Sequence, residues 1–553
     1  MDGKKYMKDR IVSIIKCMIM FLAVMVLFIS AKNMKNIDTI TKNANLIIYG
    51  DTIASGYNPL VEGDKIYLSF DTVEKFIDET LFYDSSNEKI ILTTENGLYK
   101  FSCQNNIASK NLKEYDAKAS WKKINDTPYI DMNLIKEIYN IKCEYDKETN
   151  TISVDKLNTS DIPLNYNEVR LYNRLSTKSE VLDVLNTNNT VTVYTDSLKH
   201  NRWYKVKSDD GKIGYIEKAA VTVKDDSSDD KDKDEQANSE DTEKLIMFWQ
   251  YGSSLKTLGD KIEGVNVVMP TWYAISDDQG SVEINYNEDY YNKAKANGYQ
   301  IWPIITNGID NKDLDKKQVT SEIMNDEQKR ENLIRNIVDI IKNNKLDGIN
   351  IDFEGMLEED KYMYTQFLRE LYPMVKETGA KLSVDIYFTS YIDRQGVGKA
   401  CDYVMLMGYD QRGNWSKEAG SISEINWVDK NIASLIQDSN IPSSKIILGV
   451  PFYTRLWIES SSGDLSTKVY TMNDTQNFLS KYNLTPTMDN VSGQNYIAMK
   501  DGDDLWRLWI EDADSISKRA DIVTKYNLAG ITAWQKGYET DDIWSLLNEK
   551  LKK

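Results

Sequence analysis

Eight short apolar segments, separated by stretches with helical spacing, recur between residues 244 and 553 and constrain the fold more than any other feature. They begin at Leu245, Val265, Ile301, Gly348, Leu382, Tyr403, Ile446 and Ala529. Strands that alternate with helices form parallel sheets, because each return connection crosses the sheet as a helix. Eight such units predict an α/β fold, a (β/α)8 barrel. Residues 454–527 are too long for a simple loop, so we expect an insertion between the seventh and eighth strands.

The fourth segment is unusual because polar residues alternate with apolar ones. Side chains along a strand point to opposite faces in turn, so Asn350, Asp352 and Glu354 share one face. Helices must cover the apolar face, which sends the polar row into the barrel and up to its C-terminal mouth, where barrel enzymes hold their sites. Burial beside a like charge should raise the pKa of one carboxyl group and keep a proton available for catalysis. From this strand alone, a buried polar network and a magnesium site remain as alternatives.

The composition excludes several classes of function. A single histidine, His200, cannot build a Ser-His-Asp or Cys-His system or a His-ligated zinc site, and we expect it on the surface of a β-rich segment. Acid–base chemistry therefore falls to carboxylates, and we expect no metal and no cofactor. The formal net charge of −18 argues against nucleic acid as a partner.

Residues 1–36 have the pattern of an export signal, in which four basic residues precede an apolar run from Ile11 to Ala31. Ile29-Ser-Ala is a weak cleavage site, whereas the apolar core is short for a membrane-spanning helix. A cleaved signal peptide and an uncleaved membrane anchor both remain open, and we favour the anchor. We expect the protein to be exported and either anchored on the extracytoplasmic side of the membrane or secreted to the cell wall.

Three further segments precede the barrel. Residues 45–157 contain an internal repeat with an offset of 62 residues, in which each copy predicts a strand, a helix and another strand. Residues 160–223 show short alternating strands and predict a small all-β domain. Residues 225–243 hold ten acidic residues against two lysines, so we expect an extended acidic linker over residues 224–243. The repeat pairs Tyr67, Tyr83, Asp84 and Ile90 with Tyr129, Tyr145, Asp146 and Ile152.

Three cysteines lie beyond the N-terminal segment, and an odd number argues against a disulfide framework. A bridge between Cys103 and Cys143 and a set of buried thiols, with Cys401 as the third, both remain open; we favour the thiols.

The barrel motifs resemble those of family 18 glycoside hydrolases. The run from Asp347 to Glu354 looks like the signature of that family, with its last residue as the acid. Met407-Gly-Tyr409-Asp410 resembles the second motif, and Trp534 resembles the floor of the −1 sugar subsite. The likeness spans 244–553 and is closest to the spore-cortex and cell-wall subgroup. Residues 45–157 resemble the N-terminal domain of copper amine oxidases, a stalk without copper chemistry, and residues 160–223 resemble a bacterial Src-homology-3-like domain.

The resemblance implies a retaining, substrate-assisted mechanism. Glu354 would protonate the glycosidic oxygen, Asp352 would orient the acetamido group of the sugar, and Tyr409 would hydrogen-bond its carbonyl oxygen. Many chitinases have a third carboxylate where this chain has Asn350, so a proton relay of the chitinase type is in doubt here.

The expected function is an exported glycosidase that cleaves β-1,4 bonds beside N-acetylglucosamine in peptidoglycan of the cortex or wall. A chitinase that acts on chitooligosaccharides and an inactive carbohydrate-binding wall protein are the alternatives. Besides the three catalytic candidates, the predicted substrate-binding residues include aromatic rings, for which core packing is the competing explanation, and weaker polar candidates. They are Asn350, Trp534, Trp272, Asp410, Met407, Trp457 and Glu511.

Overall fold

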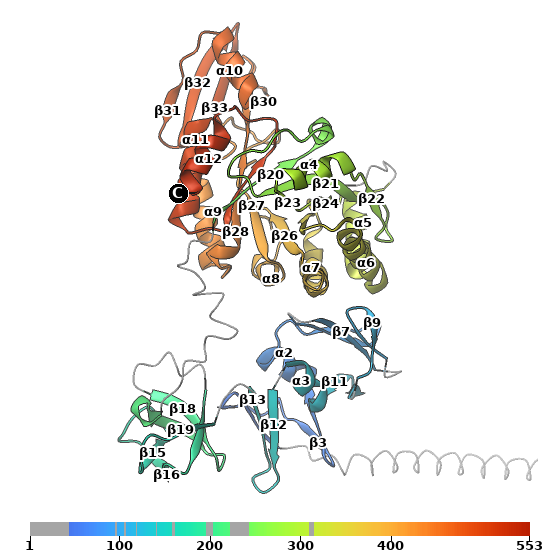
Figure 1. Cartoon of the computed structure of the whole chain (residues 1–553), viewed down its shortest axis with the longest axis vertical. Coiled ribbons are helices and arrows are strands. Elements are labelled where there is room, and N and C mark those ends of the chain that lie inside the picture. The colour runs from blue at the N-terminus through green and yellow to red at the C-terminus, as the bar shows by residue number, and fades with distance from the viewer. Residues whose placement is uncertain are drawn as a thin grey trace, which may run out of the picture. The chain divides into compact units, whose positions relative to one another are not determined.

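The computed structural model describes residues 44–552, except for 95–96, 104–106, 118, 140, 157–160, 195–202, 222–242 and 309–313. The expected anchor at 1–36, His200 and residues 224–242 of the expected linker therefore lie outside the described residues. Within the described ranges, no helix is long and apolar enough to cross a membrane. The chain divides near residue 230 into two compact units (Figure 1), and each is described by itself.

Eight parallel strands close into a barrel, which confirms the predicted fold class. β34 pairs with both β28 and β20, and β20 also pairs with β21, so the ring has no open edge among these eight strands. Short strands β22 (Val282–Ile284) and β23 (Gln300–Ile301) add to β21. The barrel strands are β20 (Leu245–Gln250), β21 (Val267–Ile275), β24 (Ile304–Thr306), β25 (Gly348–Asp352), β26 (Lys381–Ile386), β27 (Tyr403–Met407), β28 (Ile446–Pro451) and β34 (Gly530–Trp534).

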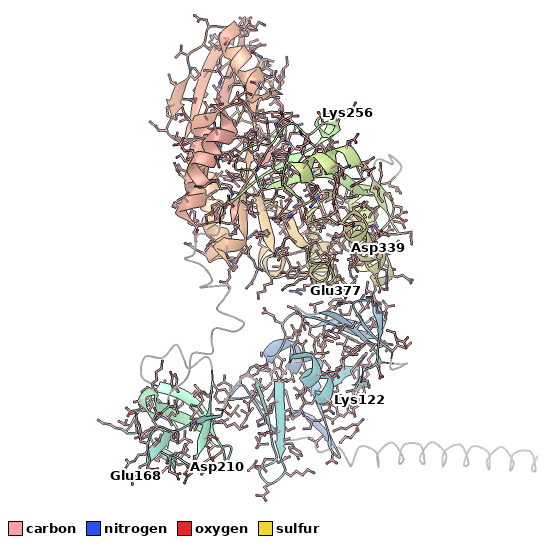
Figure 2. The ribbon with its side chains drawn as sticks, viewed as in Figure 1. Lys122, Glu168, Asp210, Lys256, Asp339 and Glu377 are labelled. Carbon is pink, nitrogen blue, oxygen red and sulfur yellow. The ribbon has the colours of Figure 1, made fainter. Side chains whose placement is uncertain are left out.

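Amphipathic helices surround this barrel, and α6 shows why they form. Asp326 caps its first turn by accepting hydrogen bonds from two backbone N–H groups, and Lys345 ends it in a left-handed conformation. Leu333 and Ile337 are buried, whereas Asp339 is exposed on the outer side (Figure 2). The helices are α4 (Glu288–Ala296), α5 (Lys316–Asn325), α6 (Glu327–Asn344), α7 (Lys361–Lys376), α8 (Arg394–Lys399), α9 (Ile425–Gln437), α11 (Ala513–Lys525) and α12 (Ile543–Leu551), with short 3-10 turns η3 (Gly252–Lys256), η4 (Glu358–Asp360) and η5 (Ser443–Lys445).

A five-stranded antiparallel sheet interrupts the barrel between β28 and β34. Its strand order is β30-β29-β33-β32-β31, and helix α10 (Met472–Lys481) covers it. Leu456, Phe478 and Leu508 belong to a small core of its own. Helix α11 comes after this sheet and contacts α12, β28 and β34, so it belongs to the barrel. The strands are β29 (Tyr453–Glu459), β30 (Leu465–Thr471), β31 (Thr487–Asp489), β32 (Gln494–Asp501) and β33 (Asp504–Ile510).

The first part of the other unit is a duplicated α+β domain, as predicted. β4 (Lys65–Ser69) and β11 (Thr127–Asp131) begin 62 residues apart, and so do α2 (Phe70–Phe76) and α3 (Met132–Tyr139). β4 pairs with β11 in antiparallel register, so the two copies join edge to edge. Its other strands are β1 (Asn45–Ile48), β2 (Asp51–Thr52), β3 (Leu60–Glu62), β5 (Phe82–Asp84), β6 (Lys89–Thr94), β7 (Gly97–Ser102), β8 (Ala108–Lys110), β9 (Lys113–Tyr115), β10 (Trp121–Ile124), β12 (Ile141–Asp146) and β13 (Thr151–Lys156).

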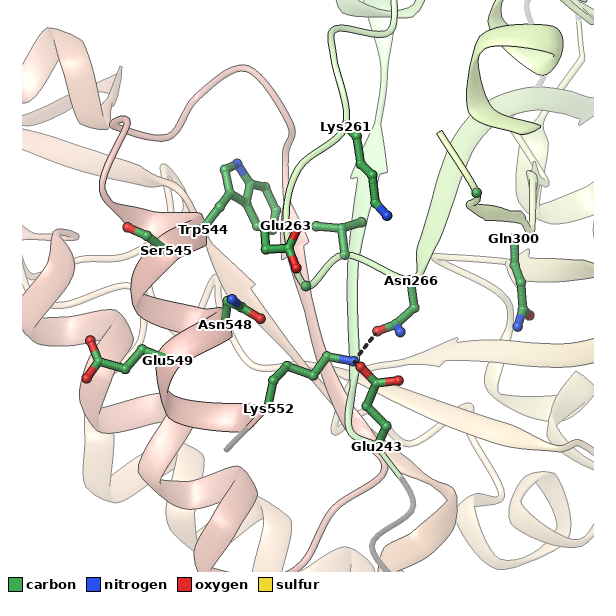
Figure 3. A pocket seen from close by; sticks show the side chains of 13 residues that line it. Glu243, Lys261, Glu263, Asn266, Gln300, Trp544, Ser545, Asn548, Glu549 and Lys552 are labelled. Atoms are coloured by element: carbon green, nitrogen blue, oxygen red, sulfur yellow. Dashed lines mark hydrogen bonds and ion pairs between the residues drawn. The ribbon is translucent and has the colours of Figure 1, made fainter. Parts of the chain in front are cut away.

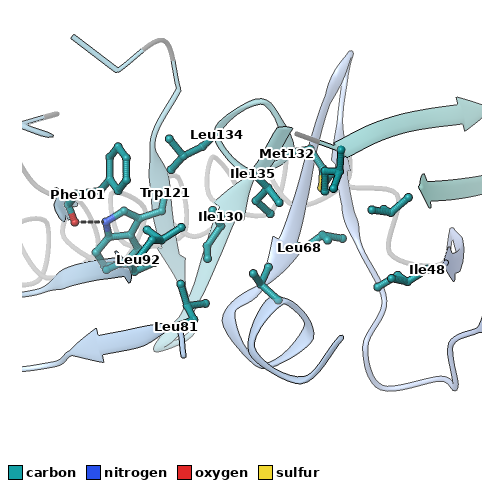
Figure 4. Close-up of a cluster of buried hydrophobic side chains, with 14 of the residues drawn as sticks. Ile48, Leu68, Leu81, Leu92, Phe101, Trp121, Ile130, Met132, Leu134 and Ile135 are labelled. Carbon is teal, nitrogen blue, oxygen red and sulfur yellow. Dashed lines mark hydrogen bonds between the residues drawn. The ribbon is translucent and has the colours of Figure 1, made fainter. Parts of the chain in front are cut away.

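Both copies contribute to one hydrophobic core. Leu68 and Ile130, which occupy paired positions on β4 and β11, lie in the same cluster (Figure 4). The indole N–H of Trp121 donates a 2.8 Å hydrogen bond to the carbonyl oxygen of Phe101, which satisfies the one polar atom of that buried ring. Cys103 and Cys143 are partly buried thiols, and Cys401 in the barrel is a buried one.

The second part of this unit is an all-β domain in which six strands form one sheet, in the order β14-β17-β18-β19-β15-β16. Leu171, Val191, Val206 and Ile216 form its core. The strands are β14 (Asp161–Pro163), β15 (Val169–Tyr172), β16 (Val181–Leu185), β17 (Thr190–Val193), β18 (Trp203–Ser208) and β19 (Ile213–Glu217), followed by the turn η2 (Lys218–Ala220).

Candidate active site

The polar row of β25 lies on the inner side of the barrel. Phe353 points the other way and stacks on Phe367 of α7, with ring centroids 5.8 Å apart. Asn350 is completely buried, whereas Asp352 and Glu354 are partly exposed at the C-terminal end of the strand. The alternation read from the sequence therefore places two carboxyl groups at the mouth of the barrel, above a buried amide.

Asn307 holds the backbone of Glu354 from the neighbouring strand end. Its side-chain oxygen accepts a 2.9 Å hydrogen bond from the Glu354 N–H, and its amide nitrogen donates a 3.1 Å bond to the Glu354 carbonyl oxygen. Asn307 is itself fully buried and also donates to the Thr320 hydroxyl of α5, at 3.0 Å. Nothing in the sequence around Asn307 indicated this role. These two hydrogen bonds fix the position of the Glu354 backbone, from which the carboxyl side chain extends.

Burial raises the pKa values of both carboxyl groups at the mouth. The pKa of Asp352 rises to about 8, first because it is desolvated and then because Glu354 carries a like charge. Burial also raises the pKa of Glu354, although the positive charge of Lys316 opposes the effect. The two side chains share a hydrogen bond and titrate together. At neutral pH the pair therefore holds a proton, which an acid catalyst needs.

A third carboxyl group, which the sequence reading missed, faces the row from β26. Asn350 Nδ2 donates a 2.9 Å hydrogen bond to Asp385 Oδ1 and a 3.0 Å bond to the Ser383 hydroxyl. Burial, and then the charge of Asp352, raise the pKa of Asp385 well above its usual range. The signal was present in the sequence, because Ser383, Asp385 and Tyr387 alternate with apolar residues as the row on β25 does.

Aromatic rings lie close to the carboxyl groups. Tyr409 is buried at the end of β27, and its ring centroid lies 6.2 Å from that of Trp249 and 6.4 Å from that of Tyr387. Met407 belongs to the same cluster. Burial raises the pKa of Tyr409 well above its usual range, so its hydroxyl stays a hydrogen-bond donor.

Asp410 and Trp534 complete the mouth. Asp410 adopts a left-handed backbone conformation, accepts a 2.6 Å hydrogen bond from the Tyr453 hydroxyl and lies 3.6 Å from the Arg455 guanidinium group. Trp534 ends β34 and is partly exposed, and the ring of Tyr251 stacks on it at 6.2 Å. The mouth therefore combines a partly exposed flat ring with a carboxyl group held in place by hydrogen bonding.

The comparisons with known proteins agree with this geometry. The model of the glycosyl hydrolases family 18 matches residues 244–539, more than half of the chain. The chain belongs to this family. The copper amine oxidase N-terminal domain matches residues 47–154, and the bacterial SH3 domain matches residues 167–222. These matches confirm the three resemblances read from the sequence. The first match identifies the barrel as a glycosidase domain.

Several relatives share this family 18 barrel. The uncharacterized glycosylase YvbX of Bacillus subtilis is 24% identical over 273 residues, which cover 47% of this chain and 77% of the relative. The cortical fragment-lytic enzyme of the same organism is 24% identical over 243 residues, which cover 41% of this chain and 55% of that enzyme. The matched part of this chain thus spans only about half of that second relative.

Solved structures confirm the fold alone, because their sequence identity is low. A chitinase from Chromobacterium violaceum superposes with a TM-score of 0.51 at 20% identity and covers 56% of this chain and 99% of its own. The Bacillus cereus spore cortex-lytic enzyme SleL gives 0.50 at 21% identity, with 56% and 76% covered.

Three predicted binding residues are enclosed in the family 18 barrel or its insertion rather than exposed. Trp272 is 1% exposed and packs against Tyr290, and Trp457 is 1% exposed with its indole N–H bound to a backbone carbonyl. Glu511 forms a buried ion pair with Arg519 at 2.9 Å. None of the three presents a free face to a sugar in this structure.

A cavity of about 1040 Å³ lies at the other end of the barrel, where the strands begin (Figure 3). Lys552 reaches Asn266 at 2.9 Å and Glu243 at 2.7 Å there. None of the site residues predicted from the sequence lines this cavity. Barrel enzymes have their active sites at the opposite end, where the strands finish.

Proposed function

We propose that this family 18 glycosidase cleaves β-1,4 bonds beside N-acetylglucosamine in peptidoglycan, with retention of configuration. The observation that carries the proposal is the Asp352–Glu354 pair, two partly buried carboxyl groups that hold a proton at neutral pH beside Tyr409 and Trp534. Family 18 enzymes are an exception to the scheme of two independent carboxylates, since the substrate supplies the nucleophile.

The first step breaks the glycosidic bond. The proton held by the pair passes from Asp352 to Glu354 and from there to the glycosidic oxygen, which leaves as an alcohol. The acetamido oxygen of the sugar attacks the anomeric carbon at the same time and closes an oxazolinium ring. Asp352 is now ionised; it accepts a hydrogen bond from the ring N–H and balances the positive charge, while the Tyr409 hydroxyl donates to the acetamido oxygen.

The second step opens the ring. Glu354, now a carboxylate, takes a proton from a water molecule, whose oxygen attacks the anomeric carbon and expels the acetamido oxygen. Two displacements on the same carbon restore the original configuration. Trp534 supports the sugar ring from below, and Asp410 binds a sugar hydroxyl.

Peptidoglycan is favoured over chitin by the domains beside the barrel and by the relatives. An SH3 domain precedes the barrel, and two of the relatives described above are named a cortical fragment-lytic enzyme and a spore cortex-lytic enzyme. Export across the membrane, for which the first 36 residues carry the signal, brings the enzyme to this polymer. Chitin is the second candidate, because a relative from Orgyia pseudotsugata multicapsid polyhedrosis virus is named a probable endochitinase, 24% identical over 278 residues.

The test uses the full chain on cortex-type muropeptides, mature peptidoglycan and chitooligosaccharides, with the new reducing end identified in each case. Glu354→Gln removes the acid and should lower the rate of cleavage by about 1,000-fold. Glu358→Gln makes the same chemical change at an exposed position of η4 and should leave the rate unchanged. Equal cleavage by Glu354→Gln would reject the mechanism, and product from chitin alone would reject peptidoglycan as the substrate. An inactive sugar-binding protein would bind but cleave none of the three.

A further inference from the structure

Strand β25 lacks the third carboxylate that many chitinases carry at the position of Asn350, yet the barrel interior still contains three carboxyl groups. Asp385 is 3% exposed and lies on the adjacent strand, β26. The amide of Asn350 donates to it at 2.9 Å, so the two side chains form one buried pair. Burial of a carboxyl group in such a place costs desolvation free energy, so we expect this carboxyl group to have a function.

The strand register places Asp385 beside Asp352. Asn350 pairs with Ser383 and Ile351 pairs with Val384, so the next step along the two parallel strands brings Asp352 alongside Asp385. Neighbouring strands lie about 4.8 Å apart, and both side chains point into the barrel. Asp352 Oδ1 and Asn350 Oδ1 are buried and accept no hydrogen bond from any residue that the structure describes. These two oxygen atoms therefore lie near the carboxyl group of Asp385, which can carry a proton.

We propose that Asp385 supplies, from β26, the carboxyl group that β25 lacks, and that it acts as a positioning residue for Asp352. It stays protonated through the reaction, accepts the hydrogen bond of Asn350 on one oxygen, and donates its own O–H to Asp352 Oδ1 when Asp352 becomes ionised. No bond to the substrate is involved, and the proton remains on Asp385 throughout. The inference rests on the proposed function, because it assigns a partner to the group that stabilises the oxazolinium ring.

The groups around Asp385 support a proton on it. Asp352 and Glu354 on β25 act on it as negative charges, and both raise its pKa together with burial. The tyrosines that face it, Tyr364 of α7, Tyr387 after β26 and Tyr409 after β27, are themselves buried groups with raised pKa values. Hydrogen bonds from Asn350 and Trp249 lower the pKa of Asp385, but the effect of burial is the largest and the pKa stays well above its usual range. A neutral acid in an apolar site is a strong hydrogen-bond donor at neutral pH.

The test exchanges the two partners. Asp385→Asn keeps the shape but weakens the donor, so kcat should fall about 10-fold or more with little change in KM. Because Asp352 then holds its own proton more tightly, the alkaline limb of the pH profile should move to higher pH. The double variant Asn350→Asp with Asp385→Asn restores one carboxyl group and one amide in the same pair. Its kcat and its alkaline limb should return most of the way to the wild-type values.

Ser383→Ala is the matched control, because it removes another hydrogen bond of the Asn350 amide without touching a carboxyl group. It should leave the alkaline limb in place. The assay uses 4-nitrophenyl N,N′-diacetylchitobioside beside muropeptides. With this good leaving group Glu354→Gln loses less activity, whereas Asp385→Asn should still lose activity on both substrates, because the ionised Asp352 stabilises the oxazolinium ring whichever group leaves.

The inference is overturned if Asp385→Asn keeps the wild-type kcat and pH profile, if its limb moves to lower pH, or if Ser383→Ala has the same effect. It is also overturned if the double variant melts like the wild type but recovers no activity. Failure of the wild-type chain to cleave any of the substrates would reject the proposed function instead, so the two failures are distinct.

Discussion

Replacing Asn307 with alanine should lower the activity of the enzyme by about 100-fold, although none of the proposed catalytic side chains changes. The change removes the 2.9 Å and 3.1 Å hydrogen bonds to the backbone of Glu354 and the 3.0 Å bond to Thr320. At about 1 kcal/mol net for each bond, the free energy of unfolding should fall by about 3 kcal/mol. The rate of cleavage should also fall, because a displacement of the acid by about 1 Å lowers a rate by about 100-fold.

Two measurements separate these effects. Thermal or denaturant unfolding gives the loss of stability, and hydrolysis of the aryl chitobioside at a temperature where the variant is folded gives kcat. Asn426→Ala serves as control, since Asn426 is exposed and makes one long hydrogen bond, of 3.4 Å. A variant at position 307 that is folded and retains kcat within about threefold of the wild type would refute the role of Asn307 in placing Glu354.

Two further predictions follow from other buried charges. The folded-state pKa of Asp352, about 8, lies above its unfolded value, so the folded state binds more protons between pH 4 and pH 8, and its stability should decline across that window. Asp352→Asn should therefore stabilise the protein at pH 8 more than at pH 4 in thermal unfolding; an equal shift at both values would contradict the raised pKa. Glu511→Gln should lower the free energy of unfolding by about 3 kcal/mol, because it leaves Arg519 charged and buried without its ion-pair partner. The KM for muropeptides should stay at the wild-type value, and a large rise in KM would return Glu511 to the substrate-binding residues.

The sequence predicted the parts of the molecule that depend on short-range periodicity. The repeat in the stalk domain predicted both the copies and their offset, because identical local patterns fold into identical local elements. The polar row on β25 was predicted for the same reason, since alternation along one strand needs no knowledge of its neighbours.

The parts that the sequence did not reveal depend on contacts between distant segments. Asp385 meets Asn350 only because two strands lie in a particular register, and Asn307 reaches Glu354 only because β24, which it follows, pairs with β25. Trp272 and Trp457 lie near strand ends as Trp534 does, the ring proposed to stack on the sugar, and only packing distinguishes the three. Neighbouring aromatic rings enclose the first, and a backbone carbonyl holds the second.

The insertion between β28 and β34 contributes residues that hold a side chain at the mouth of the barrel. Its first strand, β29, begins with Tyr453, whose hydroxyl donates to Asp410, and continues to Arg455, whose guanidinium group lies 3.6 Å from that carboxylate. A minimal barrel made by joining Pro451 to Asp512 would therefore lose part of the wall of the catalytic mouth. Anyone who trims this enzyme, or grafts its insertion elsewhere, should leave the first three residues of β29 with the barrel.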